Sequence, residues 1–153
     1  MIGAIILRRM LRSGFEAMNR GDIDSILAGW GNDAIFDYPS IISVGGTLKG
    51  KKEIAEGFRM AFEEYPKRKF IVKNICFQEV FPLLSILFGT YVITIEWTTE
   101  QTSKEGKELK YDGLTVIHGR RSRHTHVRDY ISFVGLPPIQ TMMKLSASLE
   151  SQN

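Results

Sequence analysis

The sequence predicts an α+β protein in which helices pack on one face of a curved, mostly antiparallel sheet. Two patterns lead to this prediction. Up to Pro66, apolar residues recur at spacings of three and four, which places them on one face of a helix. After Pro66 the spacing changes to two, which is typical of half-buried strands. Helices followed by a run of strands are the element order of α+β folds.

The first part of the chain contains three expected helices. The first covers 4–19, and Gly21 and Asp22 after it suit a left-handed helix cap and the N-cap of the next helix. The second is short and its apolar face ends at Trp30. The third begins near Gly50 and ends at Pro66, because proline cannot donate a helical hydrogen bond.

Strands are expected from period-two patterns and from turn signals between them. The polar, glycine-containing segments 103–107 and 119–123 are predicted to be hairpin turns. The apolar stretch 81–95 is interpreted as a turn followed by a buried strand. The expected strands cover 34–38, 70–77, 84–99, 108–118 and 124–133, and a short helix is expected in the tail at 137–149.

Composition narrows the class of protein. The 153 residues, 43% of them hydrophobic and 24% charged, predict a single globular domain over 1–153 with its core at about 4–134. The lone Cys76 excludes a disulfide framework and a cysteine zinc site. A net charge of +3 is too small to indicate nucleic acid, and the apolar runs are shorter than the roughly 20 residues that span a bilayer. We therefore expect a cytoplasmic protein with neither nucleic acid nor membrane as partner.

Three stretches of the sequence resemble the SnoaL-like, nuclear-transport-factor-2-like superfamily. They are 18–22, the segment 31–39 with the helix start at 50–54, and 111–116 running through a basic turn into 127–131. The resemblance implies a cone-shaped barrel, in which a strongly curved, mostly antiparallel, cystatin-like sheet wraps over three N-terminal helices around a deep apolar pocket. Members include ketosteroid isomerases, polyketide cyclases, dehydratases, limonene-1,2-epoxide hydrolases and proteins without catalytic activity, so fold alone does not decide function.

Asp129 is the first candidate for a catalytic residue. Alternation places it on one strand face with Thr125, Val127, Ile131 and Phe133, and the histidines at 124 and 126 on the other. A carboxyl group buried on such an apolar face has a raised pKa, which suits a general acid or base. In the epoxide hydrolases, the stretch that 128–130 resembles supplies a catalytic aspartate. The alternative is a surface ion pair with Arg128 or Arg123.

Tyr38 is the second candidate. Its phenol could hold a substrate oxygen, or it could be a core tyrosine with a backbone partner. Alternation points Asp37 the other way, and Glu96 is expected on the outer side of its strand unless a bulge turns it towards Asp129. The residues expected to bind the ligand are Trp30, Phe36, Phe58, Trp97, Leu114, Val116 and Val127.

The sequence also departs from the known enzymes that it resembles. The arginine and second aspartate of the epoxide hydrolases fall near Trp97 and Thr99, and the catalytic residues of the steroid isomerases fall near Gly14, Tyr38 and Leu114. Two hypotheses therefore stay open. One is an acid/base enzyme for a polyketide, terpenoid or steroid-like molecule, without metal or cofactor. The other is a ligand-binding or scaffold domain.

Apolar residues on both faces of the strand that contains Val92, Ile93 and Ile95 indicate that the outer face of the sheet is also covered. From this pattern we expect a homodimer.

Overall fold

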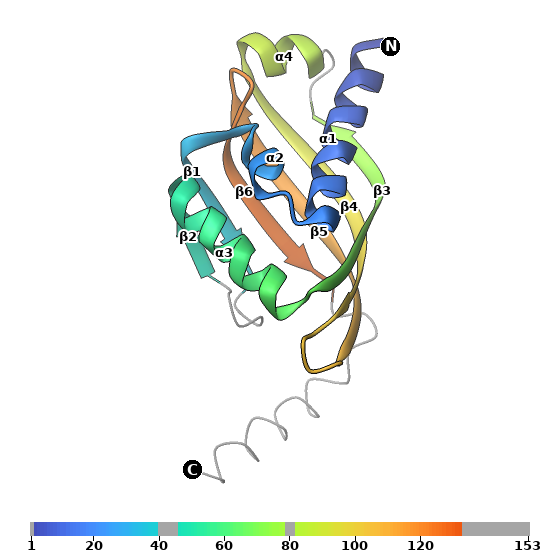
Figure 1. Cartoon of the computed structure of the whole chain (residues 1–153). Helices are drawn as coiled ribbons and strands as arrows, with labels where there is room; N and C mark the ends of the chain where they lie inside the picture. The colour runs from blue at the N-terminus through green and yellow to red at the C-terminus, as the bar shows by residue number, and fades with distance from the viewer. Residues whose placement is uncertain (1, 40–45, 79–81, 133–153) are drawn as a thin grey trace.

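Six strands form one open sheet in the computed structural model, which describes residues 2–39, 46–78 and 82–132 (Figure 1). Their spatial order is β2-β1-β6-β5-β4-β3, and every neighbouring pair is antiparallel except β1 and β6, which are parallel. The strands are β1 (Trp30–Tyr38), β2 (Gly46–Lys49), β3 (Lys67–Phe77), β4 (Thr90–Thr102), β5 (Glu108–Arg120) and β6 (Arg123–Ile131).

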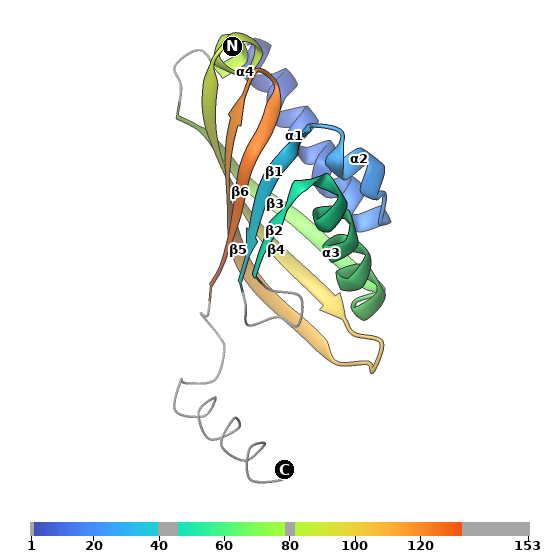
Figure 2. The same ribbon diagram turned by 90° about the vertical axis from the view of Figure 1, so that its left-hand side faces the viewer.

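The helices cover one face of this sheet. They are α1 (Ile2–Arg20), α2 (Ile23–Leu27), α3 (Gly50–Glu64) and α4 (Pro82–Phe88). Figure 2 shows α1, α2 and α3 together on the concave side, and α4 lies at the end of the sheet near the start of α1. The expected α+β fold with a curved, mostly antiparallel sheet is confirmed. The sheet does not close on itself, since β2 and β3 remain separate edges.

The turn between α1 and α2 has the predicted chemistry. Gly21 has a φ of 72°, a left-handed conformation that few other residues adopt at a helix end. The Asp22 side chain accepts a hydrogen bond from the backbone N–H of Ser25 at 3.1 Å and so caps α2. Just before this turn, the Asn19 side chain donates to the Phe70 carbonyl and accepts from the Phe70 N–H, which fixes the end of α1 to β3.

The predicted element boundaries are wrong in two places. Trp30 is the first residue of β1 and does not belong to α2. Part of the strand expected at 84–99 is helix α4, and β4 begins only at Thr90. The short edge strand β2 was not predicted. The expected helix at 137–149 lies outside the described residues.

Helix α4 depends on a contact that local sequence cannot reveal. The turn between β5 and β6 consists of Arg121 and Ser122, which both have positive φ. The N–H of Ser122 donates to the Ile86 carbonyl at 2.6 Å, and the N–H of Arg121 donates to the Gly89 carbonyl at 2.9 Å. The first bond satisfies a carbonyl group in the last turn of α4, which has no partner within the helix, and the second holds the residue that follows the helix. A distant hairpin therefore stabilises this helix.

Two glycines of β5 allow aromatic side chains of β4 to lie across the sheet. Gly113 is paired with Trp97, and Gly119 is paired with Tyr91. A Cβ atom at either glycine would overlap the ring of its aromatic partner. Both rings are almost completely buried, at 2% exposure each. Because glycine has no side chain, each position leaves space for an aromatic ring. The ring in turn shields the glycine backbone from solvent.

We predict that Gly113→Ala lowers the free energy of unfolding by about 1–3 kcal/mol, because the new methyl group must displace the Trp97 ring from a close-packed position. Urea unfolding measures this. The control is Gly14→Ala in the middle of α1, where an added Cβ meets nothing within 4 Å. This variant should be more stable by up to about 1 kcal/mol, because alanine favours the helix. Equal stability of the two variants would contradict the account of Gly113.

Candidate active site

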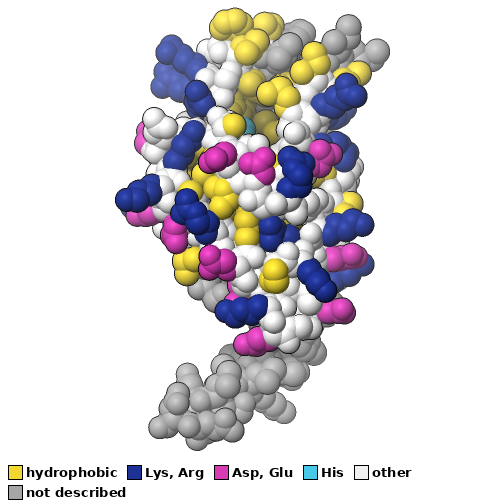
Figure 3. Space-filling model, in the orientation of Figure 1, with side chains coloured by type: hydrophobic (Ala, Val, Ile, Leu, Met, Phe, Trp, Pro, Cys, Tyr) yellow, Lys and Arg dark blue, Asp and Glu magenta, His cyan; other side chains and the backbone are white. Residues whose placement is uncertain are grey.

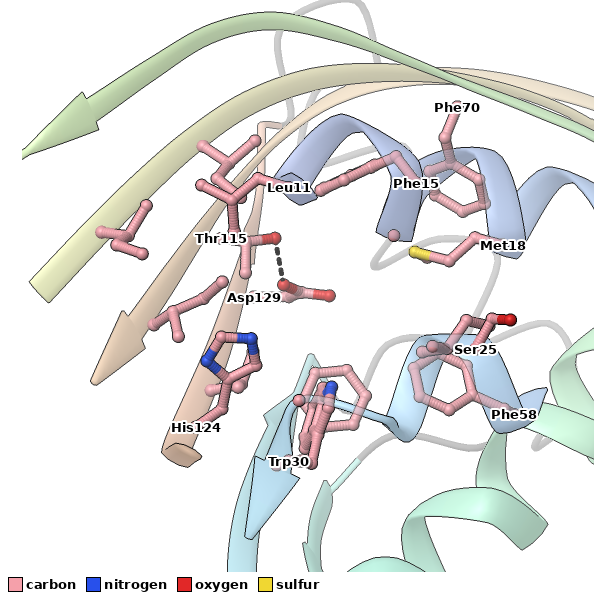
Figure 4. Close-up of a pocket in the computed structure, with 18 of the residues that line it drawn as sticks. Leu11, Phe15, Met18, Ser25, Trp30, Phe58, Phe70, Thr115, His124 and Asp129 are labelled. Atoms are coloured by element: carbon pink, nitrogen blue, oxygen red, sulfur yellow. Dashed lines mark hydrogen bonds between the residues drawn. The ribbon is translucent and has the colours of Figure 1, made fainter. Parts of the chain in front are cut away.

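A cavity of about 410 Å³ lies between the helices and the concave face of the sheet. Figure 4 shows its two sides, with Leu11, Phe15 and Met18 of α1 opposite Trp30 and the strands. Its walls are mainly apolar. Of the residues expected to bind a ligand, the structure brings together Trp30, Phe36, Phe58, Trp97 and Val127, and it places both Tyr38 and Asp129 among the lining residues.

Asp129 enters the cavity from β6, and its carboxyl group points towards α1 and α2 (Figure 4). It is held by one hydrogen bond, in which the Thr115 hydroxyl donates to Oδ1 at 2.6 Å. Thr115 in turn accepts a hydrogen bond from the indole N–H of Trp97 at 2.8 Å. The three residues lie on the adjacent strands β4, β5 and β6, so the sheet itself sets their spacing.

This chain of hydrogen bonds determines which carboxyl oxygen carries the proton. An indole N–H can only donate, so the Thr115 oxygen acts as its acceptor. The single hydroxyl proton of Thr115 is then available for Asp129 Oδ1, which must accept. When Asp129 is neutral, its proton therefore resides on Oδ2, the oxygen that Thr115 leaves to the cavity.

The cavity makes Asp129 a weak acid. Burial raises the pKa of Asp129 from 3.8 to about 7, because few polar groups replace the water that would stabilise the carboxylate. The hydrogen bond from Thr115 acts in the opposite direction and lowers this pKa, but it does not offset burial. Near neutral pH, both the acid and its conjugate base are present in comparable amounts, which is favourable for proton transfer.

His124 also lines the cavity, and sequence reasoning missed it. The strict alternation expected for β6 fails because His118 pairs with His126 while Gly119 pairs with His124, which leaves Thr125 as an extra residue. This bulge turns His124 to the same face as Val127 and Asp129. Nothing in the local sequence signals a bulge at this position.

The His124 ring is fixed by aromatic neighbours. Its Nδ1 shares a hydrogen bond with the Tyr91 hydroxyl at 3.0 Å, and the Trp30 ring meets it edge-on. Burial lowers the pKa of His124 to about 4 and raises the pKa of Tyr91 to about 12. Both groups are therefore neutral at physiological pH. The cavity thus contains a neutral imidazole in addition to the titrating carboxyl group.

Tyr38 reaches the cavity from the end of β1, between Phe36 on its own strand and Tyr111 on β5. Burial raises the pKa of Tyr38 well above 10, and the nearby Tyr111 and Asp129 add to this effect. The phenol therefore keeps its proton and can serve as a hydrogen-bond donor.

Leu114 and Val116 do not line the cavity, which corrects the expectation for these two residues. They flank Thr115 on β5, and since Thr115 points inwards, alternation turns both neighbours to the convex face. Glu96 lies on the same outer side, where Asn74 donates a hydrogen bond to it. A pairing of Glu96 with Asp129 is thereby excluded.

Asp37 points away from the cavity, as alternation predicts. Its Oδ2 is 2.6 Å from Nε2 of His126 and 2.9 Å from a guanidinium nitrogen of Arg128, and Thr47 donates to its other oxygen. The hydrogen bond from His126, ahead of those from Thr47 and Arg128, lowers the pKa of Asp37 to about 2. Arg128 therefore pairs with Asp37, and Arg123 donates to the Ala28 carbonyl. The surface ion pair of Asp129 with Arg128 or Arg123, which was the alternative, does not form.

Within the described ranges, no three histidine, cysteine, aspartate or glutamate side chains come together in a way that could hold a metal ion. In the same part of the chain, no helix is long and apolar enough to cross a membrane.

The fold and the sequence together define the family. Residues 11–127 match the model of the SnoaL-like domain, so the chain belongs to this family. No curated protein matches the sequence.

Solved structures with the same fold share little sequence with this chain. An NTF2-like protein of unknown function from Burkholderia pseudomallei has a TM-score of 0.69 at 17% identity, over 84% of this chain and 92% of that one. TerC, co-crystallised with polyporic acid, has a TM-score of 0.66 at 18% identity, over 83% and 92%. A protein with a ketosteroid isomerase-like fold from Catenulispora acidiphila, in complex with trimethylamine, has a TM-score of 0.64 at 14% identity, over 80% and 85%.

We predict that Asp129 titrates near pH 7 in a carbon-detected NMR experiment, and that Thr115→Val makes it about a tenfold weaker acid. The variant removes the one hydrogen bond that stabilises the carboxylate, so the pKa must rise. The control is Thr98→Val, because Thr98 donates to Asp112 on the outer face and should leave Asp129 unchanged. A pKa near 4 for Asp129 in the wild-type protein would rule out a desolvated acid.

Proposed function

We propose that the protein is a SnoaL-like enzyme that catalyses proton transfer on a small apolar molecule bearing a ketone, hydroxyl or related oxygen. The reaction class is isomerisation, cyclisation, dehydration or hydration of a polyketide, terpenoid or steroid-like compound. The observation that carries this proposal is a titratable carboxyl group, Asp129, in an apolar cavity that raises its pKa to about 7.

The cavity supports the class of substrate. Its volume of about 410 Å³ falls in the range of small-molecule sites, roughly 300–1,000 Å³. Aromatic rings form much of its wall, with Phe36 and Phe58 stacked at 5.7 Å and Trp30 edge-on to both. Such walls favour a flat, apolar, ring-shaped molecule over a polar or charged one.

The polar groups support the type of reaction. As a carboxylate, Asp129 takes a proton from a carbon or a water molecule through Oδ2, and the acid so formed returns it elsewhere on the substrate. Tyr38 retains its proton and donates a hydrogen bond to the substrate oxygen on which negative charge develops. His124 is neutral and acts as a second polar contact that orients the ligand. No bound cofactor is needed for these steps.

Two structural neighbours are named for a small-molecule ligand or an activity. TerC was crystallised with polyporic acid, and another neighbour is described as a putative hydroxylase from Streptomyces galilaeus. With sequence identities below 20%, these structures support the fold, and the chemistry is inferred from the residues of this chain. A cytoplasmic location stays a prediction.

We predict that the protein accelerates exchange of the C1 hydrogens of 2-tetralone for deuterium in heavy water, followed by proton NMR. This bicyclic ketone suits the apolar walls, and exchange requires only removal and return of a proton next to a carbonyl group. Asp129→Asn should lose at least about a hundredfold in rate, because the amide cannot accept the proton. Tyr38→Phe should show a smaller loss, since it removes one donor to the oxygen.

The matched control is Asp112→Asn, which alters a carboxylate of β5 on the outer face, where it pairs with Lys73. Its exchange rate should equal that of the wild-type protein. If the wild-type protein produces no exchange but 2-tetralone still quenches the fluorescence of Trp30 and Trp97, the cavity binds without catalysis. The protein would then be a ligand-binding domain.

The convex face supports a second proposal, that two copies associate through it. Leu114 and Val116 are only half-buried there, and Tyr130, which is paired with Leu114, is exposed. These three side chains form an apolar group in the middle of the convex face. A second copy would remove it from water.

We predict a dimer by light scattering at micromolar concentration, and a monomer for Leu114→Lys. The new ammonium group can pair with the adjacent Glu96 in a monomer but would be costly to bury between two copies. Met60→Lys, at an exposed position of α3 away from the convex face, is the control and should remain dimeric. A wild-type monomer contradicts this proposal.

A further inference from the structure

An unusual set of exposed apolar side chains surrounds one end of the cavity. They are Ile6 and Met10 of α1 and Leu84, Leu87 and Phe88 of α4, and we call them the apolar rim. Phe88 is the extreme case, with 76% of its surface exposed. Leu84, Leu87 and Phe88 are spaced three and four residues apart, so they share one face of α4. Single exposed apolar residues are common on proteins, but a cluster of this kind marks an interaction site.

The apolar rim adjoins the mouth of the cavity. Met10 and Leu87 belong to both, because each is exposed to solvent and also lines the cavity. In Figure 3 the hydrophobic side chains gather over α4 and the start of α1, around a hollow whose base is also hydrophobic. A molecule that enters or leaves through this opening must pass between these side chains.

The charges on the described segments that carry or adjoin the apolar rim are all of one sign. The described segments that border it, residues 5–12, 84–90 and 117–126, contain six arginines and neither aspartate nor glutamate. The arginines are Arg8, Arg9 and Arg12 of α1 and Arg120, Arg121 and Arg123 of the β5–β6 hairpin. Acidic and basic side chains are mixed over the rest of the face in Figure 3. The chain as a whole carries a net charge of only +3, so the excess of arginine is local.

We propose that the apolar rim is a docking surface for an anionic lipid membrane. Apolar side chains that enter the headgroup region, bordered by arginines that meet lipid phosphates, are the features of peripheral membrane binding. The sequence predicts no membrane partner because no segment is long enough to span one, but surface adsorption requires no such segment. A second copy of the chain is a poorer occupant, because symmetric association would bring the same arginines face to face.

This orientation would place the cavity mouth against the lipid. An apolar molecule dissolved in the bilayer could then enter the cavity without crossing water. This consequence for substrate entry rests on the proposed function, whereas the membrane contact itself does not. The convex face of the sheet points away from the helices, so membrane contact and association of two copies through that face are compatible.

The test is flotation of the full chain with two kinds of vesicle, one of phosphatidylcholine alone and one with about 30 mol% phosphatidylglycerol. We expect binding to the anionic vesicles only, and release at about 1 M NaCl, where the Debye length falls to about 3 Å. Leu84→Ser/Phe88→Ser should reduce the partition coefficient at least about tenfold, because it removes apolar surface that enters the membrane. Arg120→Gln/Arg121→Gln should reduce it about tenfold by loss of two charges.

Two matched controls should bind as the wild-type protein does. Met60→Ser removes a similarly exposed apolar side chain from α3, and Lys67→Gln/Lys69→Gln removes two charges from exposed positions at the start of β3. The proposal is overturned if the protein binds neither vesicle, or if it binds both equally. It is also overturned if Leu84→Ser/Phe88→Ser lowers the mass in light scattering without lipid, since the apolar rim would then contact a second copy.

The two proposals can fail separately. Asp129→Asn should still bind anionic vesicles, since its carboxyl group lies inside the cavity. Conversely, Leu84→Ser/Phe88→Ser should still exchange the hydrogens of 2-tetralone in free solution, because neither residue lines the cavity.

Discussion

The chemistry of the cavity depends on a single hydroxyl group. Thr115 has one proton to donate, and the indole of Trp97, which cannot accept, leaves Asp129 as its recipient. A second donor to the carboxylate would bring its pKa back towards the ordinary value, and no donor at all would keep it protonated to still higher pH. One hydrogen bond in an apolar surrounding therefore sets an intermediate acidity, and it also fixes which oxygen faces a ligand.

Strand β5, which supplies Thr115, also positions the other polar side chains of the cavity. Gly113 and Gly119 lie on either side of it on β5, and each admits an aromatic ring from β4. One ring, Trp97, supports Asp129 through Thr115, and the other, Tyr91, binds His124 directly. Two glycines without any functional group thus position the two polar side chains that β6 contributes to the cavity. An added methyl group at either glycine would therefore affect the cavity as well as stability.

Local patterns predicted much of this structure because most elements follow their own periodicity. The helix ends at Gly21 and Pro66, the hairpin turns and the inward face of Asp129 all follow from spacing and from residue chemistry. Two of the failures have a common cause, since each depends on a distant part of the chain. Helix α4 is capped by the β5–β6 hairpin, and the bulge that turns His124 inwards arises in the pairing of β6 with β5. Leu114 and Val116 were placed with the cavity, although alternation about Thr115 excludes both from it.

The parallel pairing of β1 with β6 has a consequence for biosynthesis. β6 lies between β1 and β5, so the sheet remains in two parts until residues 123–131 have been made. Before that point, β3, β4 and β5 can form one part and β1 and β2 the other, but β5 and β1 each keep an unpaired edge where β6 will lie. Contacts between positions so far apart in the chain form slowly, and exposed strand edges invite aggregation. Strand β6 supplies Asp129 and His124, and it is also the last strand of the described sheet to be synthesised. A chain truncated before β6 would be a substrate for chaperones and proteases.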